Sequence, residues 1–449
     1  MHLRSLSVLV LVLLTAAPLV LAQDTLLQSG PMLGYSTHRE VAVWVQTTQP
    51  ADVQVRYRPE GTTADFEVSE VVRADGDSWL TAHVVLFGLE PGTRYAYDVL
   101  LDGEVVARPY PTVFQTQTLW QWRTDPPEFT IAFGSCAYVN DPPFDRPGNG
   151  YGGDYQIYES IAAQQPDAML WLGDNVYLRE VDWWSERGID YRYSHTRALP
   201  EMQPLLAATH HFATWDDHEF GPNNSDRSYV LKGETLDAFK RYWANPTYGL
   251  PETPGVFGHF EWGDVEFFLL DNRYHRSPSD APRTPDKTML GDAQEQWLID
   301  ALTASRAPFK VVVSGGQVLS RFQLFENWAT FPHARQRLLD AIDARGIEGV
   351  LFLSGDRHHG ELIRIDRPGR YPLFDFTSSP LTAGASSARF EQENPDRVPG
   401  TFVTQRHFGT LSLSGPRTDR VMELNAYDVD GALLWSHTIR ARDLRNGDE

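Results

Sequence analysis

The stretch FTIAFGSC, residues 129–136, is the most informative part of this chain, because an apolar run ends there in a residue that can bind a metal ion. Three more apolar runs have the same form: DAMLWLG precedes Asp174, HHFATWD precedes Asp217 and His218, and GVLFLSG precedes Asp356 and His358. In an open α/β sheet, ligands bind at the carboxyl ends of the strands. Thiolate, carboxylate and imidazole donors at four such ends therefore predict a polynuclear metal site.

The composition limits the classes of partner. The chain has 449 residues, enough for two or three domains, and a hydrophobic content of 41%, which is ordinary for a globular protein. Its formal net charge of -21 argues against binding to a nucleic-acid backbone. The same charge repels anionic substrates at long range, so a phosphate ester as substrate would require bound cations to reverse the field locally.

Residues 1–22 have the pattern of a secretory signal. Arg4 supplies a positive start, an apolar core follows, and residues 20–22 form a small-residue cleavage pattern. A membrane anchor is the alternative, but Thr15 and Pro18 interrupt an apolar run that is already short for a span. We therefore expect an exported protein, periplasmic or secreted, with no transmembrane span after signal cleavage.

The rest of the chain divides by pattern into two domains. Residues 27–118 are predicted to be all-β, because short alternating runs such as VAVWVQT and RYAYDVLLDG are separated by turn residues. Residues 89–95 resemble the tyrosine corner of fibronectin type III sandwiches. After a linker at 118–127, residues 128–440 alternate strand-like and helix-like segments.

The second domain is predicted to contain helices where apolar residues recur at three- and four-residue spacing: 154–165, 199–208, 233–243, 292–305 and 332–344. Buried strands are predicted at 129–134, 168–172, 265–270, 310–313 and 350–353. The chain is expected to return to strands at 408–414, 421–427 and 432–439, with Asp430-Gly431 as a hairpin turn.

Four motifs occur in the order FGSC (133–136), LGDNVY (172–177), WDDHE (215–219) and SGDRHH (354–359). Together they resemble the PhoD-like alkaline phosphatases, within the calcineurin-like metallophosphoesterase superfamily. The resemblance runs from Thr130 to Thr410 and extends to the N-terminal β domain and to LDNRYHR (270–276). It implies an α/β metallophosphatase fold, an αββα sandwich preceded by a small all-β fibronectin-like sandwich domain.

The same resemblance implies the metals and their ligands. Iron (Fe3+) would be held by Cys136, Asp174, Tyr177 and His358, and a second metal by Asp174, Asp217 and Asp356. The donor chemistry agrees, because a thiolate with a phenolate suits ferric iron, while carboxylates suit Ca2+, with Mn2+ or Mg2+ as alternatives. A carboxylate such as that of Asp174 can bridge two cations about 3.5–4 Å apart. Gln317 lies where many superfamily members have a metal-binding histidine, which leaves the shell of the second metal incomplete.

Three further residues are candidates for chemistry at the phosphate. By resemblance, His218 faces the scissile ester oxygen and, when protonated, donates to the leaving alkoxide, with Asp216 or Glu219 setting its tautomer. The alternative is a structural histidine that caps a turn. Asn223 would contact the metals or the phosphate, although the sequence GPNN also favours a turn by itself. Arg357 would hold a phosphate oxygen bidentately.

Other segments are expected around the site. The polar loop 389–400 contains proline and would reach over the site, and Trp183 or Trp184 would edge the cleft. The stretch 270–276 is expected to form a salt-bridged layer behind the metal ligands rather than to touch substrate.

The predicted function is therefore metal-dependent hydrolysis of a phosphoric ester of a small molecule, lipid or polymer, by attack of a metal-bound hydroxide. The sequence has no G-x-S-x-G motif, so no serine nucleophile is expected. Monoester and diester specificity both remain open. Two rivals are a non-catalytic binding protein and a redox iron protein built on Cys136, the single cysteine. The His218 beside a full ligand set argues against the first rival, and the carboxylate-rich shell argues against the second.

Overall fold

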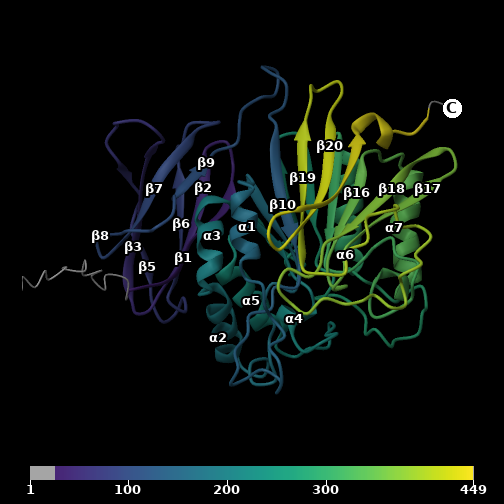
Figure 1. The fold of residues 1–449 in the computed structure, drawn as a ribbon, viewed down its shortest axis with the longest axis horizontal. Coiled ribbons are helices and arrows are strands. Elements are labelled where there is room, and N and C mark those ends of the chain that lie inside the picture. The colour runs from purple at the N-terminus through teal and green to yellow at the C-terminus, as the bar shows by residue number, and fades with distance from the viewer. Residues whose placement is uncertain (1–25, 448–449) are drawn as a thin grey trace, which may run out of the picture.

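The computed structural model describes residues 26–447, so the predicted signal segment at 1–22 lies outside the described residues. Figure 1 shows an all-β region at the N-terminal side, a group of helices beside it, and further strands flanked by more helices. Within residues 26–447, no helix has both the length and the apolar character needed to cross a bilayer.

The N-terminal region contains strands only: β1 (Leu27–Ser36), β2 (Glu40–Thr47), β3 (Ala51–Pro59), β4 (Glu67–Val68), β5 (Val72–Ala74), β6 (Thr81–Phe87), β7 (Arg94–Leu101), β8 (Glu104–Val106) and β9 (Val113–Gln115). Strands β3 and β7 alternate buried and exposed side chains, as expected when one face of a sheet covers a core. The Tyr95 hydroxyl accepts a hydrogen bond from the Glu90 amide at 2.9 Å, which is the tyrosine-corner contact. The predicted small all-β sandwich is therefore confirmed.

One sheet of this sandwich continues into the rest of the molecule. Strands β1, β2 and β6 belong to a nine-stranded sheet with the order β21-β20-β19-β10-β11-β12-β1-β2-β6. The junction is parallel pairing between β1 and β12 (His210–Thr214), with Leu33 opposite His210. The His210 ring strengthens this junction, because Nδ1 lies 2.8 Å from the Gly34 carbonyl oxygen and Nε2 accepts from the Gln115 amide at 3.3 Å.

The remaining strands form two facing sheets. The nine-stranded sheet also contains β10 (Phe129–Gly134), β11 (Ala168–Leu172), β19 (His407–Ser414), β20 (Val421–Asp428) and β21 (Leu433–Arg440). The second sheet has six strands in the order β13-β14-β15-β16-β18-β17, with bounds β13 (Gly258–Trp262), β14 (Val265–Leu269), β15 (Phe309–Ser314), β16 (Val350–Ser354), β17 (Glu361–Arg367) and β18 (Arg370–Thr377).

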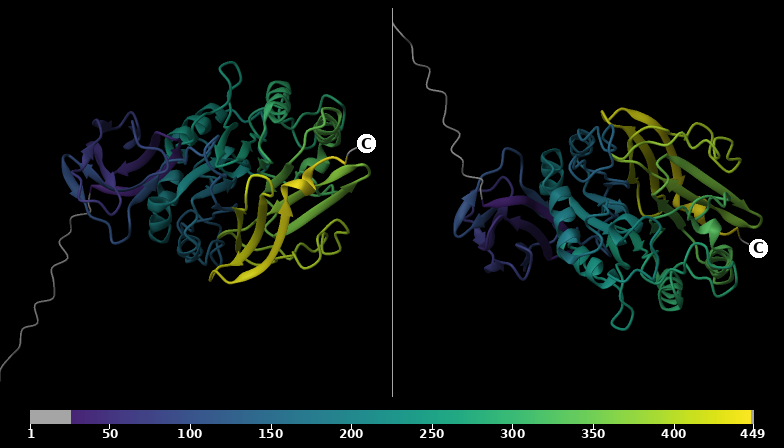
Figure 2. Two further views of the ribbon diagram at one scale, coloured as in Figure 1. Left: turned by 90° about the horizontal axis from the view of Figure 1, so that it is seen from above. Right: turned by 90° about the horizontal axis from the view of Figure 1, so that it is seen from below.

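Helices cover the outer face of each sheet, as Figures 1 and 2 show. The first sheet carries α1 (Ile157–Ala163), α2 (Glu186–Arg197), α3 (Gln203–Ala208) and α5 (Lys232–Tyr242), and the second carries α6 (Asp292–Ala304) and α7 (Pro332–Ala344). Alternate side chains of β11 pack on opposite faces of the sheet. Trp171 packs in the cluster that contains Ile157 and Tyr193, and Leu170 packs in the cluster that contains Phe267 of the second sheet. The architecture is the predicted αββα sandwich.

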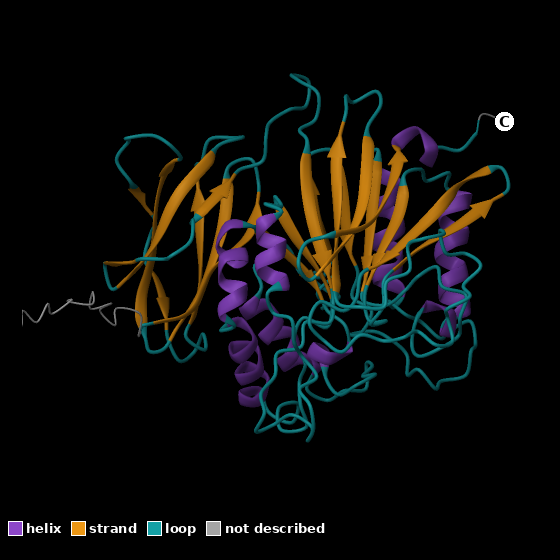
Figure 3. Ribbon diagram, in the orientation of Figure 1, coloured by secondary structure: helices purple, strands orange, loops and turns teal. Residues whose placement is uncertain are grey.

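The site lies at the carboxyl ends of the parallel strands of both sheets. Strands β10, β11 and β12 are parallel to one another, and so are β14, β15 and β16. Long loops gather below these ends in Figure 3, and the short helix α4 (Asp217–Phe220) lies among them. Donor side chains that follow each strand are thereby brought from two sheets to one place.

Candidate metal centre

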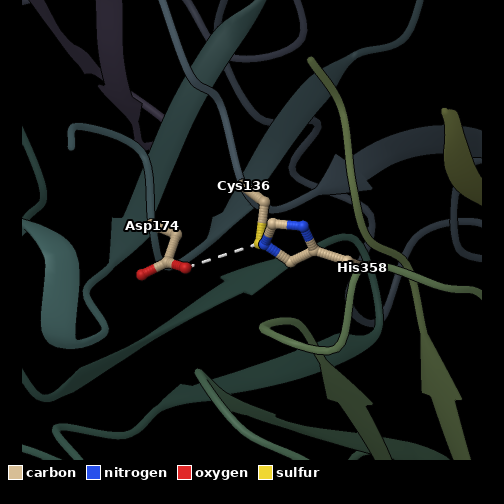
Figure 4. Close-up of side chains that lie close together, drawn as sticks. All are labelled: Cys136, Asp174 and His358. Atoms are coloured by element: carbon tan, nitrogen blue, oxygen red, sulfur yellow. Dashed lines mark hydrogen bonds between the residues drawn. The ribbon is translucent and has the colours of Figure 1, made fainter. Parts of the chain in front are cut away.

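Four predicted iron ligands converge behind the ends of β10, β11 and β16. The Cys136 thiol lies 3.4 Å from Asp174 Oδ2, and the Tyr177 hydroxyl lies 3.1 Å from the same carboxylate oxygen. The Tyr177 hydroxyl is also 3.3 Å from His358 Nε2. Figure 4 shows how Cys136, Asp174 and His358 point toward one another from separate segments. Ligand atoms of these three lie within 4.8 Å of one another, which is close enough to bind one ion.

The backbone at these residues is unusual. Cys136, Asp174, Asp356 and His358 have φ values of 62°, 54°, 67° and 55°, which lie in the left-handed region. Non-glycine residues seldom adopt this region, and such conformations persist where the surrounding structure enforces them, often at functional sites. Four of the six predicted metal ligands therefore share the left-handed backbone conformation.

The Cys136 thiol is fully buried and held by two hydroxyls. Ser135 Oγ and Ser379 Oγ each lie 3.1 Å from its sulfur. Burial, together with the nearby Asp356 carboxylate, raises the pKa of Cys136 to about 12. Burial likewise raises the pKa values of Asp174 and Tyr177 well above their usual range, with their anionic neighbours adding to the effect. Without a cation, these donors favour their neutral forms; a bound cation would favour the anionic ones.

A second group of donors shares Asp174 with the first. Ligand atoms of Asp174, Asp217 and His218 lie within 4.8 Å of one another. Burial raises the pKa of Asp217, but His218, Arg273 and the Asn224 amide more than offset this and lower it to about 2. That amide donates to Asp217 Oδ2 at 2.6 Å, while the buried Oδ1 has no hydrogen-bond partner within residues 26–447. This group offers oxygen-rich ligation next to the thiolate pocket.

Asp356 enters the same region but belongs to neither of these two groups. It lines the cavity above them, and its amide lies 3.1 Å from Ser135 Oγ. Burial, reinforced by Asp216, raises the pKa of its carboxyl to about 7. The predicted second-metal ligands Asp174 and Asp217 are thus brought together, and Asp356 lines the same cavity.

His218 lies in α4 beside the first group. Its ring stacks on that of Tyr177 with centroids 4.1 Å apart, and its backbone amide lies 3.4 Å from Asp174 Oδ1. Burial lowers the pKa of His218, which disfavours the protonated form expected from the sequence. The neighbouring carboxylates are engaged elsewhere, since Asp216 accepts from Arg273 Nε at 2.6 Å and Glu219 binds backbone amides.

Glu219 is a positioning residue whose role was not predicted. Its buried carboxylate accepts hydrogen bonds from the amides of Asp174 at 2.8 Å, Asn175 at 2.7 Å and Asp216 at 3.1 Å. Burial raises its pKa to about 8 despite these donors. The signal in the sequence was the capping-box pattern, in which the side chain of the third helical residue accepts a hydrogen bond from the backbone amide of the residue that precedes the helix. Glu219 thereby fixes the loop that carries the shared ligand.

A buried ion network supports α4 from below. The guanidinium of Arg273 binds Glu326 through two nitrogens, at 3.0 and 2.9 Å, and its Nη2 lies 3.8 Å from Asp217 Oδ1. Arg276 joins the same Glu326 carboxylate at 3.4 Å. The stretch 270–276 thus forms a salt-bridged layer next to a candidate ligand, as its sequence indicates.

Five of the donors, Asp174, Asp217, His218, Asp356 and His358, line a cavity of about 620 Å³. One wall comes from residues 384–391, so the start of the predicted overlying loop does reach the site. Asn223 lines the mouth and donates to Asn224 Oδ1 at 2.8 Å. Arg357 lines the cavity too, but its guanidinium forms a buried ion pair with Glu391. A phosphate would therefore compete with that carboxylate for Arg357.

Residues expected near the cleft are partly placed elsewhere. Trp184 is 66% exposed, and Trp183 packs against the helical core, so neither is among the described residues that line the cavity. The Gln317 amide donates to Glu361 at 2.8 Å and to Thr377 at 2.9 Å, which ties it to β17 and β18.

The donor set fits the expected metals. One pocket combines a thiol, a phenol, an imidazole and a carboxylate, and the adjoining one adds the Asp217 carboxylate, whose buried Oδ1 accepts no hydrogen bond from the described residues. Mixed sulfur, nitrogen and oxygen ligation suits a transition metal, while the oxygen-rich side suits a hard cation. A shared carboxylate between the two pockets is the arrangement used in dinuclear sites.

Comparison with known proteins identifies the family and the fold. The model of the PhoD-like phosphatase family matches residues 131–414, and that of a domain of unknown function (DUF7800) matches residues 24–119. Alkaline phosphatase D of Bacillus subtilis (strain 168) is 28% identical over 326 residues, which is 62% of this chain and 53% of that protein. The chain thus spans about half the length of this curated relative.

Two solved structures share the fold. A structure of PhoD has a TM-score of 0.76 at 18% identity, covering 93% of this chain and 92% of that one. Purple acid phosphatase PPD1 from yellow lupin (Lupinus luteus) has a TM-score of 0.65 at 12% identity, covering 92% of this chain and 75% of that one. With the family match spanning more than half of its length, this chain belongs to the PhoD-like phosphatase family.

Proposed function

We propose that the protein is a metal-dependent hydrolase of phosphoric esters, of the alkaline phosphatase or phosphodiesterase type. The observation that carries the proposal is the pair of donor groups that share Asp174 on the floor of an open cavity. A purely structural metal site has no need of an open face toward solvent. The family membership supports the same class of reaction.

The proposed ligands are divided between two ions. Cys136, Asp174, Tyr177 and His358 would hold Fe3+, and Asp174, Asp217 and Asp356 would hold one or two Ca2+ ions, with Mn2+ or Mg2+ as alternatives. When bound, such ions supply a water of lowered pKa as nucleophile and neutralise charge on the phosphoryl oxygens.

The proposed role of His218 follows from its burial. Burial lowers the pKa of His218 and so favours the neutral ring, which would act as a hydrogen-bond donor to the oxygen that leaves phosphorus. Its stacking on Tyr177 fixes the plane of the ring. Asn223, which lines the cavity, would contact the phosphate. Arg357 would contribute only after exchanging its Glu391 partner.

The test is turnover of p-nitrophenyl phosphate and bis(p-nitrophenyl) phosphate by purified protein whose metal content is measured in parallel. We expect turnover that a chelator abolishes and that added iron and calcium restore. Cys136→Ala should lose iron while retaining the native circular dichroism spectrum, because the thiol contributes a ligand but little packing volume. Asp366→Ala, at a side chain 77% exposed, is the matched control and should keep both metals. Full activity in metal-free protein would refute the proposal.

The proposal extends to organisation and location. We propose a fibronectin-like domain at 27–118 followed by a phosphatase domain at 128–440. The signal pattern of residues 1–22 supports export to the periplasm or the medium. N-terminal sequencing of the mature protein checks this; a sequence that starts at Met1 would contradict it.

A further inference from the structure

Two exposed phenyl rings line the cavity above the candidate metal centre. Phe325 is 70% exposed and Phe390 is 69% exposed, and both belong to the cavity wall. Tyr151, which is 45% exposed, adds a third ring whose hydroxyl lies 3.1 Å from His358 Nδ1. A single exposed apolar side chain is ordinary, but several in one cavity mark a surface that binds an apolar group.

Arg357 connects both phenyl rings to the metal-binding loop. Its guanidinium carbon lies 4.4 Å from the centroid of the Phe325 ring, and its Nη2 forms the ion pair with Glu391, the neighbour of Phe390. Arg357 itself stands between the candidate ligands Asp356 and His358. Arg357 thus contacts the Phe325 ring directly and pairs with the residue next to Phe390 in the same cavity wall.

The backbone under this wall is held in an uncommon conformation. Phe325 has a φ of 55° and Ala388 a φ of 44°, both in the left-handed region. A bulky residue such as phenylalanine is a genuine outlier there. Strain of this kind is retained where it presents a side chain for function. In Phe325 it presents a ring to solvent instead of to the core.

The charges of the cavity wall indicate which ester fits. Its described carboxylates belong to Asp174, Asp217, Glu326, Asp356 and Glu391, against the guanidinium groups of Arg357 and Arg389. These five carboxylates outnumber the two guanidinium groups, of which Arg357 is already paired with Glu391, so the described cavity wall offers a phosphate dianion little net positive charge apart from the metals. A diester carries one negative charge and has a second organic arm that can occupy an apolar wall.

We propose that Phe325 and Phe390 form a clamp for the planar aromatic, non-leaving arm of a phosphodiester. This inference rests on the proposed hydrolase function. In the reaction, water oxygen bonds to phosphorus, the phosphorus–oxygen bond to the leaving alcohol breaks, and that alcohol takes up a proton. The aromatic arm stays on phosphorus and is released as a monoester. The clamp therefore determines specificity and takes no part in the bond changes.

The experiment uses two substrates that share one leaving group. Bis(p-nitrophenyl) phosphate has an aromatic non-leaving arm, and methyl p-nitrophenyl phosphate has a methyl group in its place. The readout is the ratio of their kcat/KM values for the metal-loaded, full-length protein. Phe325→Ala and Phe390→Ala should each lower this ratio by about tenfold, because a stacked ring is lost. Phe390→Trp should leave the ratio at its wild-type value or raise it, since the planar aromatic surface is kept.

The control is Phe87→Ala, which removes a ring of equal exposure (68%) on β6, outside the cavity wall. It should leave the ratio unchanged. If the cavity variants lower both kcat/KM values in parallel, or change neither, the clamp is refuted. If wild-type protein loaded with both metals hydrolyses neither substrate, the proposed function itself fails, which is a different result.

Discussion

Replacing Arg273 tests whether the buried ion network positions the metal ligands. The side chain is 1% exposed and binds Asp216 through Nε and Glu326 through both terminal nitrogens. Arg273→Met keeps the apolar stem but leaves the buried Asp216 carboxylate without its counter-charge and leaves Glu326 with Arg276 alone. Arg273→Lys keeps the charge and loses the planar fork that makes the bidentate contact.

The expected magnitude follows from this burial. Removing one partner of a buried ion pair costs about 3–5 kcal/mol, because the remaining charge is left uncompensated. With a urea dependence of about 3 kcal/mol per M, Arg273→Met should lower the urea midpoint by about 1 M or more. Loss of the contact near Asp217 should also reduce metal affinity or turnover by about 10- to 100-fold. The urea midpoint and the metal affinity of Arg273→Lys should lie between those of Arg273→Met and those of the wild type.

The assay pairs urea unfolding followed by fluorescence with calcium titration of the folded protein. Arg345→Met is the matched control, because Arg345 forms an ion pair with Asp300 at the surface, where the two side chains are 40% and 59% exposed. Such a pair contributes about 0–1 kcal/mol. If Arg273→Met unfolds at the wild-type urea concentration and binds calcium normally, the network does not have the role assigned here.

Three further predictions concern other parts of the molecule. Burial lowers the pKa of His210 to about 4, so as the pH falls the unfolded chain takes up a proton before the folded one does. The free energy of unfolding should therefore fall by up to about 3 kcal/mol between pH 6.5 and 4. His210→Asn should reduce this dependence of the urea midpoint on pH, and an unchanged dependence would contradict the prediction. Gly355→Ala should reduce iron content, because a new Cβ would lie 2.3 Å from Ser135 Oγ, which contacts the Cys136 thiol. Gly369→Ala, where φ is 69° but the space is open, is the control for backbone strain. Equal iron loss in both variants would count against a steric effect at Ser135. His218→Ala should keep its metals and lose about 10²- to 10³-fold in kcat, as when a donor to the transition state is removed; wild-type kcat would assign that donor to another group.

The strands that carry the site were predictable because their signals are local. Strands β10, β11 and β16 are continuous apolar runs buried on both faces, and the donors follow directly after them. Helices with an apolar stripe, such as α5 and α7, also lie where their spacing indicates. Helix α2 was not predicted, because its buried face includes Asp190, Arg192 and Arg197 and its apolar periodicity is therefore weak.

The support of the site was less predictable, because it depends on contacts between distant segments. Ser379, which holds the Cys136 sulfur, follows β18, a strand that sequence patterns did not reveal. The partner of Arg357 is 34 residues away in an irregular loop. No local pattern states whether an arginine beside two ligands faces a phosphate or a carboxylate. The sequence thus indicates which donors meet, while folding decides which other side chains hold them in place.

The pairing of β1 with β12 has a consequence for how the chain can be shortened. Removal of the N-terminal strands would leave β12 as an open edge, with unpaired amides and carbonyls in a strand whose side chains are all buried in the intact protein. Exposed edges of this kind recruit other chains and promote aggregation. The phosphatase sheet thus depends on the preceding strands for its solubility, and these strands act as a permanent intramolecular cover. A truncated catalytic portion should therefore fail by association rather than by loss of chemistry.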